Sequence, residues 1–196
     1  MGDAGAPGWE NALQAFAAVA DDGVAWMVVG SAATRLQGVA VEPGDVDVLV
    51  HPDTPDDAMR ELAERLAPYA VPGPASDDLD EFLSAPDRPL AATPDGSWLF
   101  GRWWVGGGEL ELARIRADLP ASAVVETMGP GVWATRRTVG WRGREVPVVP
   151  LEVQLATVLL RGQADRERAV RDRLARTGTD DALLTRALAD RGLPVP

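Results

Sequence analysis

Apolar and polar residues alternate along several short stretches of this chain, and this alternation predicts β-strands. Residues 45–50 (DVDVLV) place Asp45 and Asp47 on one face of a strand and valines on the other. Residues 108–115 (GELELARI) repeat the pattern with Glu109 and Glu111. The predicted strands are 24–29, 45–50, a hairpin of 97–105 and 108–115, and a hairpin of 132–141 and 144–149.

Apolar residues at helical spacing predict helices between and after these strands. They are expected over 9–20, 31–37, from an N-cap at Thr54 to Leu66, and over 151–160, 163–176 and 180–191. Residues 72–96 are rich in Pro, Asp and Ser and are predicted to form a long loop. The expected fold class is α/β in the α+β sense, a mixed β-sheet flanked by helices. We expect a sheet domain over 1–149 and a helical segment over 150–196.

Composition narrows the possible environment and chemistry. Hydrophobic residues make up 46% of the 196 residues, enough for a proper core. The chain has no Cys, so it forms neither disulfides nor thiolate metal sites. It has no N-terminal apolar signal and no apolar run long enough to span a membrane, which favours a cytoplasmic protein.

A net charge of −11 argues against binding to long nucleic acid and favours a cationic small molecule. All 19 basic residues are Arg. One cluster, Arg136, Arg137, Arg142 and Arg144, could contact phosphates or line a nucleic-acid path. The arginines over 161–176 alternate with Asp and Glu and are predicted to form a solvated helix face.

The carboxylates within apolar strand-like segments are the strongest chemical signal. The chain holds four acidic-x-acidic pairs, but only Asp45/Asp47 and Glu109/Glu111 lie in such segments. Two carboxylates on a rigid strand suit a hard cation such as magnesium. Gly30-Ser31 lies where a predicted strand turns into a helix, which favours either phosphate binding or a simple helix cap.

The segments VVGSAATRLQG and PGDVDVLV resemble the signature of the DNA-polymerase-β-type nucleotidyltransferase superfamily. The small members are most similar: aminoglycoside and lincosamide nucleotidyltransferases, and minimal nucleotidyltransferases of toxin–antitoxin systems. The resemblance extends loosely to VPVVPLEVQLATVLLRGQADRERAV near the C-terminus. The chain departs from the family in having Glu42, Pro43 and Gly44 before the Asp pair, where relatives often carry a basic residue and Thr. It also lacks a Lys in the helix after the sheet.

The resemblance implies a third metal-site acid on a neighbouring strand. We expect Glu111 to fill this place rather than Glu109, because Glu111 has Leu on both sides. The alternative is that both glutamates line the solvent face of an edge strand.

The implied activity is transfer of a nucleoside monophosphate from a nucleoside triphosphate to a hydroxyl of a small, cationic molecule. Asp45, Asp47 and Glu111 would bind Mg²⁺ or Mn²⁺, and Glu111 would accept the hydroxyl proton. Ser31 and the amides near Gly30 would hold the β- and γ-phosphates. The alternatives are a toxin–antitoxin enzyme acting on a protein or a tRNA end, and a non-catalytic antitoxin or binding module.

Two further residue types could contribute to such a site. Five tryptophans fall in the predicted hairpins, where they pack on the sheet or stack on a base or sugar: Trp98, Trp103, Trp104, Trp133 and Trp141. His51, the only His, follows the Asp45 strand and is expected either to end it or to act near the aspartates.

Overall fold

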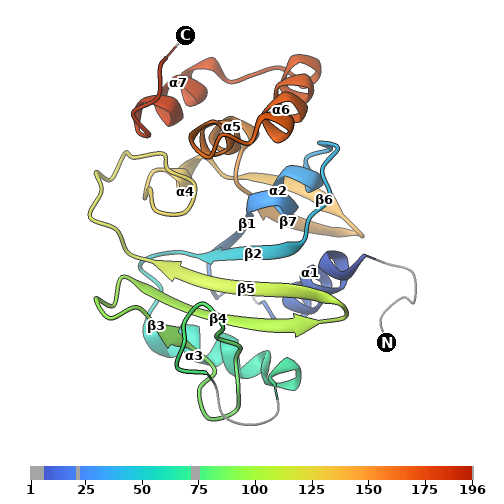
Figure 1. Cartoon of the computed structure of the whole chain (residues 1–196), viewed down its shortest axis with the longest axis vertical. Helices are drawn as coiled ribbons and strands as arrows, with labels where there is room; N and C mark the ends of the chain where they lie inside the picture. The colour runs from blue at the N-terminus through green and yellow to red at the C-terminus, as the bar shows by residue number, and fades with distance from the viewer. Residues whose placement is uncertain (1–6, 21–22, 72–75, 196) are drawn as a thin grey trace. The chain divides into compact units, whose positions relative to one another are not determined.

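The computed structural model of the chain describes residues 7–20, 23–71 and 76–195 (Figure 1). Backbone contacts divide the chain into two compact units. The first contains Met1–Trp26 and Pro43–Arg116, and the second contains Met27–Glu42 and Ala117–Pro196. Each unit combines helices with strands of mixed direction, which confirms the α/β class. The predicted boundary at 149/150 stays a prediction.

The first unit is built on four strands in the order β3-β4-β5-β2. Their bounds are Ala91–Ala92 for β3, Trp98–Val105 for β4, Gly108–Ile115 for β5 and Asp45–Val50 for β2. β4 is antiparallel to both β3 and β5, whereas β5 and β2 run parallel. The helices of this unit are α1 (Gly8–Val19), α3 (Asp56–Arg65) and the short 3₁₀ helix η1 (Ala67–Tyr69).

Helix α1 packs against β5, β2 and β4 and closes the apolar side of this sheet. Its buried side chains include Leu13 and Phe16, and the Phe16 ring meets Trp26 edge-on at 5.0 Å between centroids. The β4–β5 turn has positive φ at Gly106 and Gly107, the backbone that a tight two-residue hairpin needs. The predicted hairpin around these two glycines is therefore confirmed.

The second unit is built on three strands in the order β1-β7-β6. Their bounds are Trp26–Val29 for β1, Arg144–Val148 for β7 and Arg137–Trp141 for β6. β1 and β7 run parallel, and β7 and β6 are antiparallel. The helices are α2 (Gly30–Leu36), α4 (Val132–Thr135), α5 (Leu151–Leu160), α6 (Ala164–Thr177) and α7 (Asp181–Ala189).

Helix α5 is the centre of this unit, because every residue from Leu151 to Val158 is buried. It contacts α2, α6 and α7 (Figure 1). Its apolar side chains join those of α6 in one cluster: Val39, Leu151, Leu155, Val158, Val170 and Leu174. The break between α6 and α7 falls at Gly178, with a φ of 92°, as the sequence predicted.

Three predicted details are wrong. Thr54 does not cap α3: Pro55 holds the N-cap position without a side-chain hydrogen bond, and the Thr54 carbonyl instead accepts from Arg114. The second hairpin begins at Arg137 rather than at 132, because Val132–Thr135 forms the helix α4. The predicted loop over 72–96 contains β3, while residues 72–75 lie outside the described part of the chain.

No helix within the described residues is both long and apolar enough to cross a membrane.

Candidate active site

The two acidic pairs predicted from the sequence are brought together by the pairing of β2 with β5. In this parallel pair, Asp45 lies opposite Glu109 and Asp47 lies opposite Glu111. Neighbouring strands lie about 4.8 Å apart, so the four carboxylates emerge from one sheet face as two adjacent pairs. We call these four residues the carboxylate row. The alternate residues Val46, Val48, Leu110 and Leu112 are buried on the opposite face.

β5 is an interior strand, held between β4 and β2. The alternative in which Glu109 and Glu111 line an edge strand is therefore wrong. All four acids of the carboxylate row are partly buried. Negative charge is consequently concentrated on a rigid surface that is only partly solvated.

Burial and neighbouring charges both affect Glu109. Burial raises the pKa of Glu109 above its usual value of 4.5, and the charges of Asp45 and Glu111 raise it further, while Arg102 opposes them. Like charges at close range disfavour the ionised form, and a bound cation would relieve this.

Arg102 on β4 is the basic residue that strand pairing places beside the carboxylate row. It lies opposite Glu111 in the β4–β5 register, and its Nε donates to Glu111 Oε2 at 2.6 Å. Its Nη1 also donates to the carbonyls of Leu79 and Asp80, each at 3.1 Å. Arg102 thus ties Glu111 to the acidic segment 77–81. The sequence interpretation missed Arg102, although it is the only charged residue of β4.

The oxygen donors of the row match the ligands that Mg²⁺ prefers. In the described part of the chain, no group of three or more His, Cys, Asp or Glu side chains is arranged to hold a metal ion by itself. Magnesium at nucleotide sites is commonly held by one or two carboxylates together with phosphates. The donor chemistry of Asp45 and Asp47 fits that role, whereas Glu111 forms an ion pair with Arg102.

Gly30 and Ser31 begin helix α2 directly after β1. Gly30 has a φ of 65°, a backbone conformation that favours glycine. Its amide donates to Glu126 Oε1 at 2.8 Å, and the Gln154 side chain donates to the same oxygen. In this arrangement the Gly30 amide is engaged by a carboxylate. Ser31 is only 6% exposed, and its predicted contact with phosphate stays a prediction.

Glu126 is a second residue that the sequence interpretation missed. It is 3% exposed and lies in an irregular segment between β5 and α4. Its contact with Gly30 spans 96 positions of the chain, and no periodic pattern marks it. The buried, hydrogen-bonded Glu126 holds the first turn of α2 in place.

His51 does not lie beside the aspartates as one interpretation expected. It follows the far end of β2, about 13 Å along the strand from Asp47 at the usual rise per residue. Its Nδ1 accepts from the Asp53 amide at 3.2 Å. Its position favours the alternative that His51 ends the strand.

The tryptophans divide between packing and exposure. Trp103 is 1% exposed and belongs to the core, so it is unavailable for stacking on a ligand. Trp104 is 58% exposed and lies opposite Glu109 in the β4–β5 register. It is therefore the tryptophan best placed to contact a ligand at the row. Trp133 lies in α4 rather than in a hairpin.

The two arginine clusters behave differently. Arg168 and Arg171 form ion pairs with Asp165 and Glu167 along α6, as predicted for a solvated helix face. In the other cluster, Arg136 donates to the Trp133 carbonyl and Arg137 binds the buried Glu152.

Comparisons with known proteins found no matching family model and no matching curated protein. Two solved structures show a partial likeness. One is a candidate nucleotidyltransferase from Thermotoga maritima, with 21% identity and a TM-score of 0.48 over 84% of this chain and 90% of that one. The other is an antigenic nucleotidyltransferase-like protein from Paracoccidioides brasiliensis, with 16% identity and a TM-score of 0.41 over 93% of this chain and 73% of that one.

Both proteins are named for the nucleotidyltransferase class, and neither name specifies an aminoglycoside or toxin–antitoxin subtype. At this level of similarity they carry no argument about the reaction. The functional assignment therefore depends on the residues of this chain.

Proposed function

We propose that the protein is a magnesium-dependent nucleotidyltransferase that moves a nucleoside monophosphate from a nucleoside triphosphate to a hydroxyl of a small, cationic molecule. The observation that carries the proposal is the register of β2 with β5, which aligns Asp45 and Asp47 with Glu109 and Glu111. Aligned acids on one rigid sheet face favour the binding of a cation, in addition to the ion pair that Arg102 makes with Glu111. The segments VVGSAATRLQG and PGDVDVLV support the class.

Each acid has a distinct task in this proposal. Asp45 and Asp47 would hold Mg²⁺ or Mn²⁺ together with the triphosphate. The bound metal supplies charge neutralisation at the phosphates. Glu111 would accept the proton of the attacking hydroxyl, and its ion pair with Arg102 would orient it.

The proposed step balances as an in-line displacement. The acceptor oxygen forms a bond to the α-phosphorus, and the bond from that phosphorus to the bridging oxygen of the β-phosphate breaks. Pyrophosphate leaves with the electron pair of the broken bond. The hydroxyl proton passes to a carboxylate of the row.

The acceptor is inferred from charge. The net charge is −11, and the segment 77–81 adds acidic side chains beside Arg102. A cationic, hydroxyl-bearing molecule complements this surface better than a nucleic-acid strand. Attraction at an exposed acidic surface is screened by salt, so the apparent affinity for the acceptor should fall as ionic strength rises.

A direct experiment incubates the protein with each triphosphate, Mg²⁺ and a panel of aminoglycosides, and follows the acceptors by mass spectrometry. The expected product is an acceptor heavier by one nucleoside monophosphate, formed by the wild type and not by an Asp45→Asn, Asp47→Asn variant. Equal product from both proteins would refute the assignment. Modification of the protein itself or of added tRNA would move it to the macromolecule-modifying class.

A second candidate function is a non-catalytic binding module of the same fold. It is favoured by two contacts, because Arg102 engages Glu111 and Glu126 engages the amide of Gly30. Both contacts occupy groups that catalysis would use. Metal-dependent triphosphate binding without any turnover across the panel would support this candidate.

A further inference from the structure

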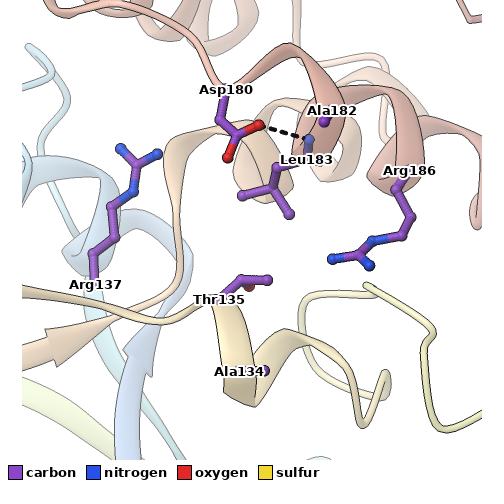
Figure 2. A pocket seen from close by; sticks show the side chains of 7 residues that line it. All are labelled: Ala134, Thr135, Arg137, Asp180, Ala182, Leu183 and Arg186. Atoms are coloured by element: carbon purple, nitrogen blue, oxygen red, sulfur yellow. Dashed lines mark hydrogen bonds between the residues drawn. The ribbon is translucent and has the colours of Figure 1, made fainter.

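A pocket of about 390 Å³ lies within the second unit (Figure 2). Its lining residues come from α4, the start of β6 and α7: Ala134, Thr135, Arg137, Asp180, Ala182, Leu183 and Arg186. Its volume is in the lower range of pockets that bind small molecules. The proposed transfer reaction uses none of these residues.

Two arginines flank the pocket from opposite sides, one from the strand β6 and one from the helix α7 (Figure 2). The Arg186 side chain makes no hydrogen bond or ion pair with any residue that the structure describes. A guanidinium presents a planar set of donors that matches carboxylate and phosphate oxygens. Arg186 therefore offers a complete donor set to a ligand.

Arg137 is held in position from behind. Its Nη2 donates to Oε1 of Glu152 at 3.0 Å, and Glu152 is fully buried. The amide of Asp180 donates to the same oxygen at 3.0 Å. The buried carboxylate thus fixes both the guanidinium and the start of α7. Such preorganisation reduces the ordering cost of binding.

Asp180 sets the remaining polarity of the pocket. Its Oδ1 accepts from the Leu183 amide at 3.0 Å and caps α7. The other carboxylate oxygen can accept a hydrogen bond from a hydroxyl of a ligand. Leu183 and the two alanines supply an apolar wall. The charges and the wall together suit a small molecule that carries both an anionic group and a hydroxyl.

We propose that this pocket binds a small hydroxylated oxyanion, either a phosphate monoester or a carboxylate, between Arg137 and Arg186. The ligand's anionic group lies between the guanidinium groups, and its hydroxyl donates to Asp180. The inference is independent of the proposed transfer reaction, because it needs neither metal nor nucleotide.

Isothermal titration calorimetry in a buffer with EDTA and without divalent cations tests the proposal. Glycerol 3-phosphate and glycerate are the probes, since they differ only in the anionic group and its attachment. We expect saturable binding of at least one probe, and the tighter probe identifies the class of oxyanion. Absence of saturable binding by both probes at millimolar concentrations would overturn the proposal.

Arg186→Gln is the informative variant, because Arg186 has no described structural contact that its loss would break. Loss of a charge-assisted contact should weaken binding by about tenfold to a hundredfold. Arg176→Gln is the matched control, an exposed arginine of α6 that does not line the pocket. Equal weakening by both variants would show only a general charge effect and would contradict the site.

An Asp45→Asn, Asp47→Asn variant separates this site from the proposed function. Its binding of the probe should equal that of the wild type. If it loses probe binding, the pocket does not bind the probe independently of the carboxylate row and the pocket proposal fails. Loss of transferase activity in that variant with retained probe binding would leave both proposals standing.

Discussion

The Nε of Arg102 donates to Oε2 of Glu111 at 2.6 Å, and both side chains are about three-quarters buried. This ion pair joins adjacent strands at the residue predicted to be the third acid of the site. It gives Glu111 a fixed orientation and a nearby positive charge. Burial raises the pKa of Glu109, which lies two residues away on the same face. The two glutamates therefore differ in their surroundings in the fold as well as in their neighbours along the sequence.

Replacing Asp45 and Asp47 together by Asn should abolish metal-dependent triphosphate binding. The amides keep the side-chain shape but remove the negative charge that a divalent cation needs. Calorimetry with a non-hydrolysable triphosphate and Mg²⁺ measures the effect. Asp78→Asn, Asp80→Asn is the matched control, since it removes the same spacing of charges from the segment before β3. Binding by the Asp45, Asp47 variant at the wild-type level would contradict the metal site.

Glu111→Gln should abolish transfer, whereas Glu109→Gln should have a milder effect. Glutamine at 111 can still accept a hydrogen bond from Arg102 but cannot take up a proton. A turnover assay with an identified acceptor ranks the two variants. The reverse order would assign the proton acceptor to Glu109, whose raised pKa makes it the alternative base.

Arg102→Met should destabilise the protein by about 1–3 kcal/mol, because it removes three charge-assisted hydrogen bonds. It should also raise the pKa of Glu109 further, since the charge of Arg102 lowers it. Urea denaturation measures the first effect, and NMR titration of the carboxyl carbons measures the second.

Arg88→Met is the matched control for this variant. The guanidinium of Arg102 lies 5.1 Å from the Phe100 ring, and that of Arg88 lies 5.0 Å from the Phe82 ring, but Arg88 binds Asp77 rather than the row. It should leave the pKa of Glu109 unchanged. A similar shift in both variants would mean that Arg102 acts through the fold and not through its charge.

The turn before β4 should weaken at acid pH. Asp95 accepts from Thr93 and Ser97, and these hydrogen bonds lower its pKa to about 2 from 3.8. A lowered folded-state pKa adds stability above the unfolded value, and that stability is lost as pH falls from about 3.8 toward 2. Asp95→Asn should show a smaller loss of stability over this window, measured by urea denaturation at each pH. A parallel decline in both proteins would contradict the role of Asp95.

The hydrophobic pattern predicted the elements that carry the carboxylate row, because the first half of each strand alternates acidic residues with buried apolar ones. The pairing of those strands was not predictable from periodicity. The parallel pairing of β2 with β5 joins segments that are far apart in the sequence. It places β5 between β4 and β2, which makes β5 an interior strand. Arg102 lies opposite Glu111 in the β4–β5 hairpin, which was predicted, but the apolar pattern did not mark it as the partner of that acid.

Other features depend on contacts that local sequence does not encode. Glu126 reaches Gly30 from an irregular segment, so neither its burial nor its partner is marked by spacing. Residues 132–135 read as the start of a strand, yet they form the helix α4. Thr54 has the chemistry of a helix cap, but its carbonyl binds Arg114 and the helix begins beyond Pro55.

The alignment of Asp45 with Glu109 and of Asp47 with Glu111 also bears on how the chain finds its fold. A slip of one residue in either strand would turn its carboxylates toward the apolar side that α1 covers, and the valines or leucines toward water. Such a mispaired sheet would bury charges without partners, at a cost far above that of a lost hydrogen bond. The same acids that are proposed to bind metal therefore reject incorrect strand pairing during folding. Replacing these acids by neutral side chains should therefore allow more chains to mispair β2 with β5 during folding, in addition to impairing the proposed reaction.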